Sequence, residues 1–262
     1  MSKDFSLLPT DLRQRCRDGS FVGPTSGLAV GYVQANMVIL PAKEAEEFTE
    51  YCELNPKPCP VLEVLAPGNP EPLKSAPGAD VRTDLPRYRV FRNGNPVAES
   101  SDIQDLWQDD LVTFLLGCSF TAEEALADAG LPLPHIKQTG FVPMYATTIA
   151  THPAGKFSGP VVVSMRPFTD EHAQQAAEIT AHYPIGHGAP IHQGDPDAIG
   201  ISDLDFPDYG MPVKMTEDQI PVFWACGVTP QEAILRAKPE LAITHAPGHM
   251  FVSDITSEST RV

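Results

Sequence analysis

Two histidines and one aspartate lie within nine positions of a stretch rich in glycine and proline, at His187, His192 and Asp195. An imidazole can take up and release a proton near neutral pH because its ordinary pKa is about 6.5. His187 has a glycine on each side, which leaves room for a ligand beside its ring. We therefore predict that His187 is a general base and that His192 or Asp195 orients it.

The same three residues leave two other interpretations open. Imidazole and carboxylate groups are metal ligands, so His187, His192 and Asp195 also suit a metal-dependent hydrolase. Their spacing matches no known metal motif, however, and we predict no metal. The side chains can equally serve only to brace an irregular loop through hydrogen bonds.

Two other turns carry groups that suit catalysis. Cys118 and Ser119 stand just before an expected helix, and backbone N–H groups at a helix start can hold an oxyanion and lower the pKa of a thiol. A buried cysteine with a capping serine is the alternative at that turn. Thr244 and His245 end an expected strand, where Thr244 could contact substrate and His245 could carry a proton or only cap the edge of the core.

Arg166 follows a run of β-branched residues that is typical of a buried strand. An arginine at the end of such a strand can grip a carboxylate with two hydrogen bonds, and a surface salt bridge is the alternative. We predict that at least three of four turns line a single pocket. These turns are 117–119, 166, 187–195 and 244–249.

The composition limits the kinds of partner. The chain has 262 residues, 42% of them apolar, which suits one α/β domain or two intimately packed smaller ones. A net charge of −16 disfavours nucleic acid. No apolar run approaches the roughly 20 residues of a membrane span, and the N-terminus has no apolar signal core. The five cysteines form no CxxC pair, so we expect a reduced, cytoplasmic protein without a cofactor, and a homo-oligomer stays open.

Strands and helices alternate along the chain, which predicts an α/β fold with a mixed, mostly parallel sheet flanked by helices. The expected strands are 33–40, 61–65, 88–92, 96–99, 161–164, 221–226, 241–245 and 250–253. The expected helices are 9–18, a segment opened by Pro41, a segment from Ile103 to Phe114, a segment from a Thr121–Glu124 capping box to Gly130, 169–182, and a segment capped by Thr229.

A series of short motifs resembles the D-glutamate cyclase family, whose bacterial members are labelled hydro-lyases. The motifs are Gly23-Pro24-Thr25-Ser26-Gly27, Gly31 to Asn36, Asn55 to Pro60, Arg82-Thr83-Asp84, Gly117 to Phe120, Val142 to Tyr145, Val163 to Pro167, His187 to Pro190, Pro221 to Gln231, and Thr244 to Gly248. Each motif is short, but together they cover nearly the whole chain in order.

The resemblance implies a single domain over 1–262, with a larger α/β part and a smaller α+β part. It also implies a lyase that closes D-glutamate to 5-oxo-D-proline with loss of water. That reaction needs a base, an acid, an oxyanion cradle and a cation for the α-carboxylate. A small carboxylic or amino acid is therefore the expected partner.

This chain departs from the family pattern at four positions. Ala146 stands where an arginine is usual, Thr148 replaces an asparagine, Ala122 a phenylalanine, and Met211 an aspartate. If the family's arginine binds substrate, this chain has a changed substrate or reduced activity, and Arg166 or Arg82 must hold the anion. A small-molecule-binding descendant without catalysis is therefore a further alternative.

Overall fold

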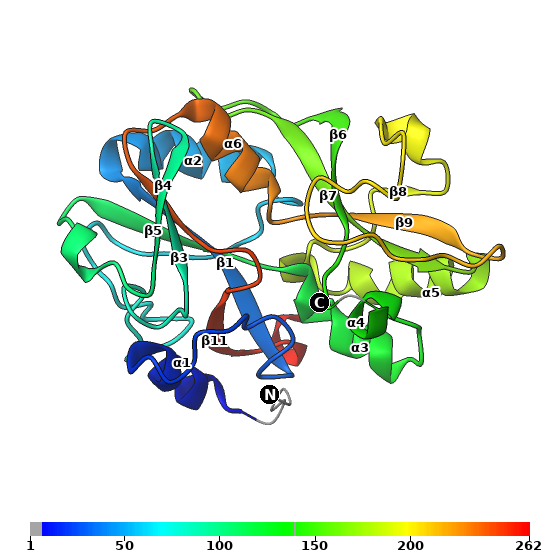
Figure 1. Ribbon diagram of the computed structural model, residues 1–262, viewed down its shortest axis with the longest axis horizontal. Coiled ribbons are helices and arrows are strands. Elements are labelled where there is room, and N and C mark those ends of the chain that lie inside the picture. Colours follow the sequence, from blue (N-terminus) through cyan, green and yellow to red (C-terminus); the bar gives the residue numbers. More distant parts are fainter. Residues whose placement is uncertain (1–6, 139) are drawn as a thin grey trace.

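A computed structural model describes residues 7–138 and 140–262, and its strands form two sheets that lie side by side (Figure 1). The helices are α1 Pro9–Arg17, α2 Ala42–Leu54, α3 Glu123–Asp128, α4 Pro134–Gln138, α5 Asp170–Ala181 and α6 Thr229–Ala237. The strands are β1 Tyr32–Pro41, β2 Val61–Val64, β3 Tyr88–Arg92, β4 Asn95–Ser100, β5 Leu111–Leu116, β6 Met144–Ala150, β7 Pro160–Phe168, β8 His192–Gln193, β9 Ile220–Ala225, β10 Ala242–His245 and β11 Phe251–Thr256.

The larger sheet has the strand order β2-β5-β1-β10-β3-β4, and β11 pairs with the first part of β1. The smaller sheet has the order β6-β7-β9-β8. The prediction of a mixed α/β fold is confirmed, but the prediction of a mostly parallel sheet is wrong, because every pairing of described strands is antiparallel.

The larger sheet shows why buried strands misled the prediction of strand direction. Met37 and Ile39 of β1 pack into a core formed with the 76–85 loop, whereas Val38 and Leu40 pack against α2 and α6 on the opposite face. Both faces are covered, so the strand is apolar throughout. Such a continuous apolar run is typical of parallel sheets, but it follows from burial on two faces and not from strand direction.

The segment from Ile103 to Phe114 corrects a second prediction. It was expected to be one helix, but it contains only a 3₁₀ turn at Gln104–Leu106 and then strand β5. Leu111 and Leu115 face one core of the larger sheet while Phe114 and Leu116 face the other, so each residue of the run has its own buried environment. The helical spacing of a few apolar side chains was coincidental.

The remaining core strands and helices agree with the sequence. The expected strands at 161–164, 221–226 and 241–245 are β7, β9 and β10, and the expected helix at 169–182 is α5, capped by Thr169. The Thr121–Glu124 capping box is not formed. The chain instead makes a 3₁₀ turn, Ser119–Ala122, ahead of α3, and the Thr121 hydroxyl makes no hydrogen bond within the described chain.

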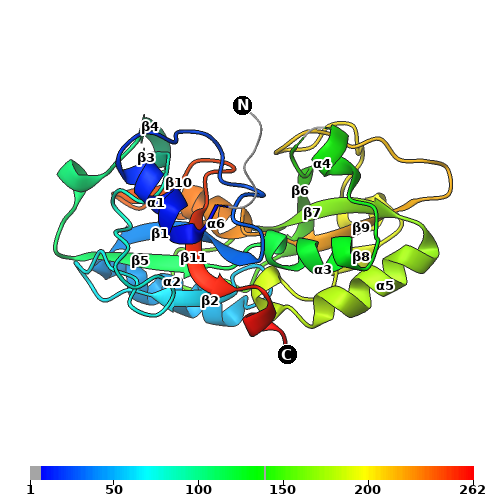
Figure 2. The ribbon, with the colours of Figure 1, turned by 90° about the horizontal axis from the view of Figure 1, so that it is seen from below.

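The smaller sheet is also covered on both faces. Phe168, Val222 and Trp224 pack against α5 and the segment around Leu131, while Met165 and Phe223 pack against the 199–204 loop. Figure 2 shows α5 running along one side of this sheet, with α3 between it and the larger sheet. In the described part of the chain, no helix is both long and apolar enough to cross a membrane.

Gly117 directly follows β5 and lies in close contact with the 3₁₀ turn Pro184–Gly186. A Cβ atom there would lie 1.9 Å from the backbone oxygen of Ile185. We expect Gly117→Ala to lower the free energy of unfolding by at least about 2 kcal/mol, because rigid backbone cannot move aside. Gly23→Ala is the matched control, since its Cβ would meet only ordinary contacts at 3.6 Å. Equal melting temperatures of the two variants would refute the close approach.

Candidate functional site

Arg166 of β7 is the centre of a buried polar group where the two sheets meet. Its Nε and Nη2 atoms donate to Oε1 of Glu123 at 3.0 and 2.5 Å, its Nη1 donates to the Ser164 hydroxyl, and its Nη2 donates to the Ser119 hydroxyl, both at 3.2 Å. The guanidinium also lies 5.5 Å from the centre of the Trp224 ring. These contacts occupy most of its N–H groups, so little of Arg166 is left to grip a substrate carboxylate.

Glu123 neutralises this arginine. Burial alone would raise the pKa of Glu123, but the charge of Arg166 and the hydrogen bond from His135, at 3.1 Å, outweigh it and lower the pKa to about 2. The carboxyl group is therefore ionised at neutral pH and cannot serve there as a general acid. Sequence reasoning missed Glu123 and His135, since both lie in segments that were expected to be ordinary helices and turns.

His187 presents an unpaired base to the interior. Its side chain is 1% exposed, and its Nδ1 lies 2.8 Å from the backbone oxygen of Lys57. A carbonyl oxygen only accepts hydrogen bonds, so Nδ1 carries the proton and Nε2 of the neutral ring keeps its lone pair. That Nε2 is buried and has no hydrogen-bond partner in the described chain. Burial lowers the pKa of His187 to about 4, so the ring is neutral at pH 7.

Two thiols lie beside these groups. Cys118 and Cys226 are both buried, and each interacts electrostatically with Arg166. Burial raises the pKa of Cys118 to about 12 and raises that of Cys226, and it outweighs the backbone N–H groups that point at each sulfur. The expected lowering of the Cys118 pKa by a helix start is therefore wrong, because desolvation dominates. We call Cys118, Glu123, Arg166, His187 and Cys226 the junction cluster.

His245 borders the junction cluster through Asn36 of β1. The Asn36 side chain donates from Nδ2 to the backbone oxygen of Gly117 at 2.8 Å, while its Oδ1 lies 3.1 Å from Nε2 of His245. The other ring nitrogen of His245 lies 2.8 Å from the backbone oxygen of Ala246. An acceptor on each nitrogen favours the protonated ring, whereas burial lowers the pKa of His245 to about 4. The stronger effect is burial, so the ring is neutral at pH 7.

The other predicted site residues lie outside this group. His192 is half-buried, with its Nε2 2.6 Å from the backbone oxygen of Asp195 and its ring against Phe223. The Asp195 carboxylate is exposed and caps a 3₁₀ turn. Thr244 is buried and donates to the backbone oxygen of its neighbour His245. The structure shows no contact of His192 or Asp195 with His187.

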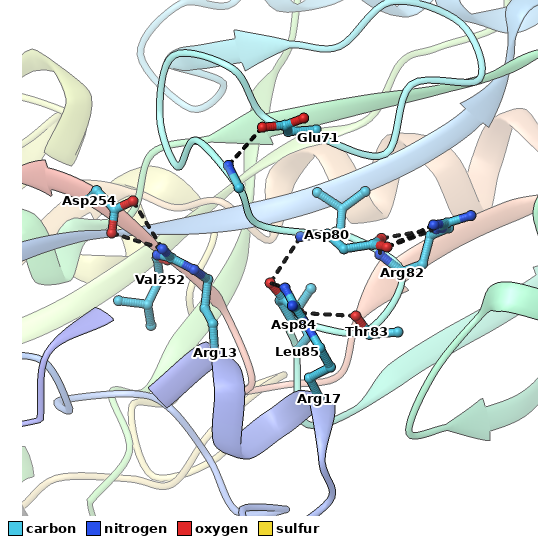
Figure 3. A network of polar contacts seen from close by, with 12 residues as sticks. Arg13, Arg17, Glu71, Asp80, Arg82, Thr83, Asp84, Leu85, Val252 and Asp254 are labelled. Atoms are coloured by element: carbon cyan, nitrogen blue, oxygen red, sulfur yellow. Dashed lines mark hydrogen bonds and ion pairs between the residues drawn. The ribbon is translucent and has the colours of Figure 1, made fainter. Parts of the chain in front are cut away.

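Arg82 belongs to a separate network on the larger sheet (Figure 3). Its guanidinium binds the Asp80 carboxylate, with a closest distance of 2.7 Å, and lies over the Trp107 ring. In the same network, Asp84 accepts hydrogen bonds from Arg17 and from the backbone of Asp80. These contacts hold α1 against the 66–87 loop, which is a structural task.

The three residues proposed for a metal also stay apart. In residues 7–138 and 140–262, no group of three or more His, Cys, Asp or Glu side chains is arranged to hold a metal ion. The arrangement of His187, His192 and Asp195 therefore gives the hydrolase alternative no support. Their use in catalysis, like that of the other predicted site residues, stays a prediction.

A cavity of about 490 Å³ lies next to the Glu123–Arg166 pair, between the loop at 26–31, the start of β1, and helices α3 and α4. Ser26, Gln34, Glu123 and His135 contribute polar groups to its wall. Ser26 and Gln34 belong to two of the motifs on which the resemblance rests, Gly23–Gly27 and Gly31–Asn36. Membership of these two motifs was the one feature of the sequence that indicated a role for Ser26 and Gln34.

The two buried histidines should make the free energy of unfolding depend on pH. The pKa values of His187 and His245 are lowered from 6.5 to about 4, so the unfolded chain takes up two protons that the folded chain refuses. The free energy of unfolding should therefore fall as pH drops from about 6.5 to about 4, by up to about 3 kcal/mol for each histidine. Glu123 adds its own loss only below pH 4.5, because its pKa is lowered to about 2.

Denaturant unfolding at several pH values measures this slope. His187→Asn should make the slope between pH 6.5 and 4 shallower by about half, since Asn does not titrate. An unchanged slope in that variant would mean that His187 is not held neutral in the folded protein.

The fold and the junction cluster together define a mixed α/β protein with a buried cluster of ionisable side chains, and such clusters are often found at functional sites. The model of the D-glutamate cyclase family matches residues 112–254, which include every residue of the cluster. The chain therefore belongs to the D-glutamate cyclase family.

Similar proteins support this assignment over nearly the whole chain. A protein of Stutzerimonas stutzeri named "Putative hydro-lyase" is 53% identical over 256 residues, covering 98% of this chain and 97% of that protein. A similarly named protein of Geobacillus kaustophilus is 54% identical over 252 residues, or 96% of each chain. A nitrogen repressor-like protein from Methanococcus jannaschii covers 90% of this chain and 91% of its own, but its 11% identity and TM-score of 0.39 support no inference.

Proposed function

We propose that this protein is a hydro-lyase that eliminates water from a small amino acid, closing D-glutamate to 5-oxo-D-proline. The observation that carries the proposal is the His187 imidazole. It is neutral, its Nδ1–H is fixed on the Lys57 carbonyl, and its Nε2 lone pair has no partner in the described chain. A fixed and unpaired base is what deprotonation of an ammonium group requires. The names of the similar proteins support a lyase.

The reaction balances with the groups at hand. The substrate ammonium loses one proton to Nε2 of His187, and the amine nitrogen then bonds to the side-chain carboxyl carbon. A second proton leaves the nitrogen, one carbon–oxygen bond breaks, and the oxygen leaves with both protons as water. Binding an anionic substrate beside His187 would raise its pKa from about 4 toward a value better matched to this task.

The carboxylates of the substrate would be held mostly by backbone groups. Arg166 and Glu123 cancel each other in charge, and most N–H groups of Arg166 are already used. Backbone N–H groups at the start of α6 and beside Phe120 point toward the sulfurs of Cys226 and Cys118. Such amides can stabilise a carboxylate or the oxyanion that forms during ring closure.

One departure from the family lies near enough to matter. Ala146 lies on β6 two residues from Met144, so both side chains are on the same face of the strand, and the Met144 sulfur lies 3.5 Å from the Cys226 sulfur. An arginine at position 146 could extend toward the cluster, whereas alanine cannot. Position 146 therefore supplies no cation for the carboxylates of the substrate.

An assay with D-glutamate tests the proposal. Reaction mixtures with D- and with L-glutamate are followed by chiral chromatography for 5-oxoproline. We expect 5-oxo-D-proline from D-glutamate at a rate far above the protein-free control and little product from L-glutamate. Equal rates with and without protein would reject D-glutamate as the substrate.

The five cysteines are all unpaired, which suits the reducing cytoplasm that we propose as the location.

A further inference from the structure

We propose that the cavity between the 26–31 loop and helices α3 and α4 is a binding site for a small organic amine with an apolar body. This site is separate from the proton-transfer role assigned to His187. Four features of the cavity wall carry the inference: its charge, its hydrogen-bonding groups, its aromatic rings and its apolar surface.

Apart from His135, which hydrogen-bonds to Glu123, the ionisable groups of the wall are acidic. Glu123, Glu124 and Asp128 line the cavity, and neither lysine nor arginine does. Arg166 compensates Glu123 from behind, but Glu124 and Asp128 form no ion pair within the described chain. A ligand that enters therefore meets two uncompensated carboxylates. An anion such as a free carboxylate would be repelled, and a cation would be attracted.

The hydrogen-bonding groups of the wall also favour a donor. Gln34 is 3% exposed and donates from Nε2 to the backbone oxygens of Thr25 and Leu28. Its Oε1 is buried and has no partner in the described chain, and Gln34 is one of the residues that line the cavity. Thr121 is 1% exposed, and its hydroxyl has no partner in the described chain. The residue lines an adjoining hollow that shares Glu124 and Asp128 with the cavity. An unsatisfied buried acceptor costs about 1–3 kcal/mol, which a ligand N–H would relieve.

The rest of the wall suits an apolar body. Its apolar and aromatic residues include Leu28, Ala29, Tyr32, Phe120, Leu133 and Ile136. The faces of aromatic rings attract ammonium groups, and the aliphatic side chains bury hydrocarbon. A metal ion does not fit this description, because the described residues offer no group of three metal ligands. An amphipathic amine satisfies the carboxylates, the free acceptor and the apolar wall together.

Benzylamine is a suitable probe, and benzyl alcohol and benzoate are its neutral and anionic counterparts. Binding is measured by titration calorimetry at a fixed ionic strength of about 0.15 M, where distant surface charges are screened. We expect benzylamine to bind in the millimolar range, benzyl alcohol more weakly and benzoate not at all. Binding of benzoate as strong as that of benzylamine, or no binding of benzylamine, would overturn the proposal.

Variants place the probe in the cavity. Glu124→Gln combined with Asp128→Asn should weaken benzylamine binding at least about tenfold. Because the net charge of −16 attracts any cation, the control removes the same charge elsewhere, with Glu46→Gln and Glu50→Gln on the exposed face of α2. Equal weakening by both pairs would show non-specific attraction and overturn the site.

A steric test does not depend on charge. Ala127 is exposed on α3 and lines the cavity, so Ala127→Phe should obstruct it without disturbing the core. Ala129→Phe is the matched control, because Ala129 is exposed just beyond the same helix and lines a different hollow. We expect loss of benzylamine binding in the first variant only. Full binding by Ala127→Phe would exclude the cavity as the site.

Discussion

Replacing His187 with alanine should lower the turnover of D-glutamate by about 10²–10⁴-fold, the usual cost of losing a general base. The imidazole is the buried group whose neutral ring and free Nε2 lone pair suit proton abstraction. The backbone at His187 has a φ of 75°, which histidine adopts more readily than alanine, so alanine removes the ring and also adds backbone strain. Turnover and thermal melting should be measured on the same samples.

Two companion variants separate catalysis from structure. Alanine leaves the Lys57 carbonyl without its donor, which costs stability, whereas His187→Asn can keep that hydrogen bond and suits the left-handed backbone. We expect His187→Asn to melt close to the parent and still to be inactive. His192→Ala, in the same loop but without contact to the cluster, should keep its activity within about twofold. Full activity in His187→Asn would exclude His187 as the base.

The largest effect on stability should come from the buried ion pair. Glu123→Gln leaves the Arg166 charge buried and uncompensated, so the free energy of unfolding should fall by about 3–5 kcal/mol. Arg166→Met strands the carboxylate in the same way. The double variant should lose clearly less free energy of unfolding than the two single variants together, because it leaves no buried charge without a partner.

An exposed pair on the larger sheet is the matched control. Arg89 and Glu99 lie 2.8 Å apart, with side chains 36% and 39% exposed, so Glu99→Gln should cost less than about 1 kcal/mol. Chemical denaturation of all variants at one pH measures these differences. A Glu123→Gln variant as stable as the Glu99→Gln variant would show that Arg166 is not enclosed as the structure indicates.

Local sequence patterns predicted many of the elements but not the direction of the strands. The run at 161–164 and the segment 221–226 are strands because their residues pack on both faces of the smaller sheet. The same two-sided burial gives no information on whether neighbours run parallel or antiparallel. In β5, two-sided burial also hid the strand, because its apolar residues fit a helical period as well as a strand.

The site was predictable where chemistry is concentrated in a short segment and unpredictable where it depends on distant pairing. The glycines around His187 predicted an irregular turn, which the structure contains, but they did not predict that His187 would be buried. The partner of Arg166, by contrast, is 43 positions away in the chain. Nothing near Glu123 in the sequence distinguishes it from the adjacent Glu124, and only the packing of α3 buries the first and leaves the second partly exposed. Arg82 also belongs to one of the quoted motifs, but it pairs with Asp80, two residues away.

A crystal structure with 5-oxo-D-proline bound tests the central claim most directly. The account predicts that the product lies within the junction cluster, with its ring nitrogen or lactam oxygen within hydrogen-bond distance of Nε2 of His187. Its carboxylate should accept hydrogen bonds from backbone amides beside Cys118 or Cys226. Product bound instead at the His192–Asp195 turn or beside Arg82, with Nε2 of His187 still unpaired, would contradict it.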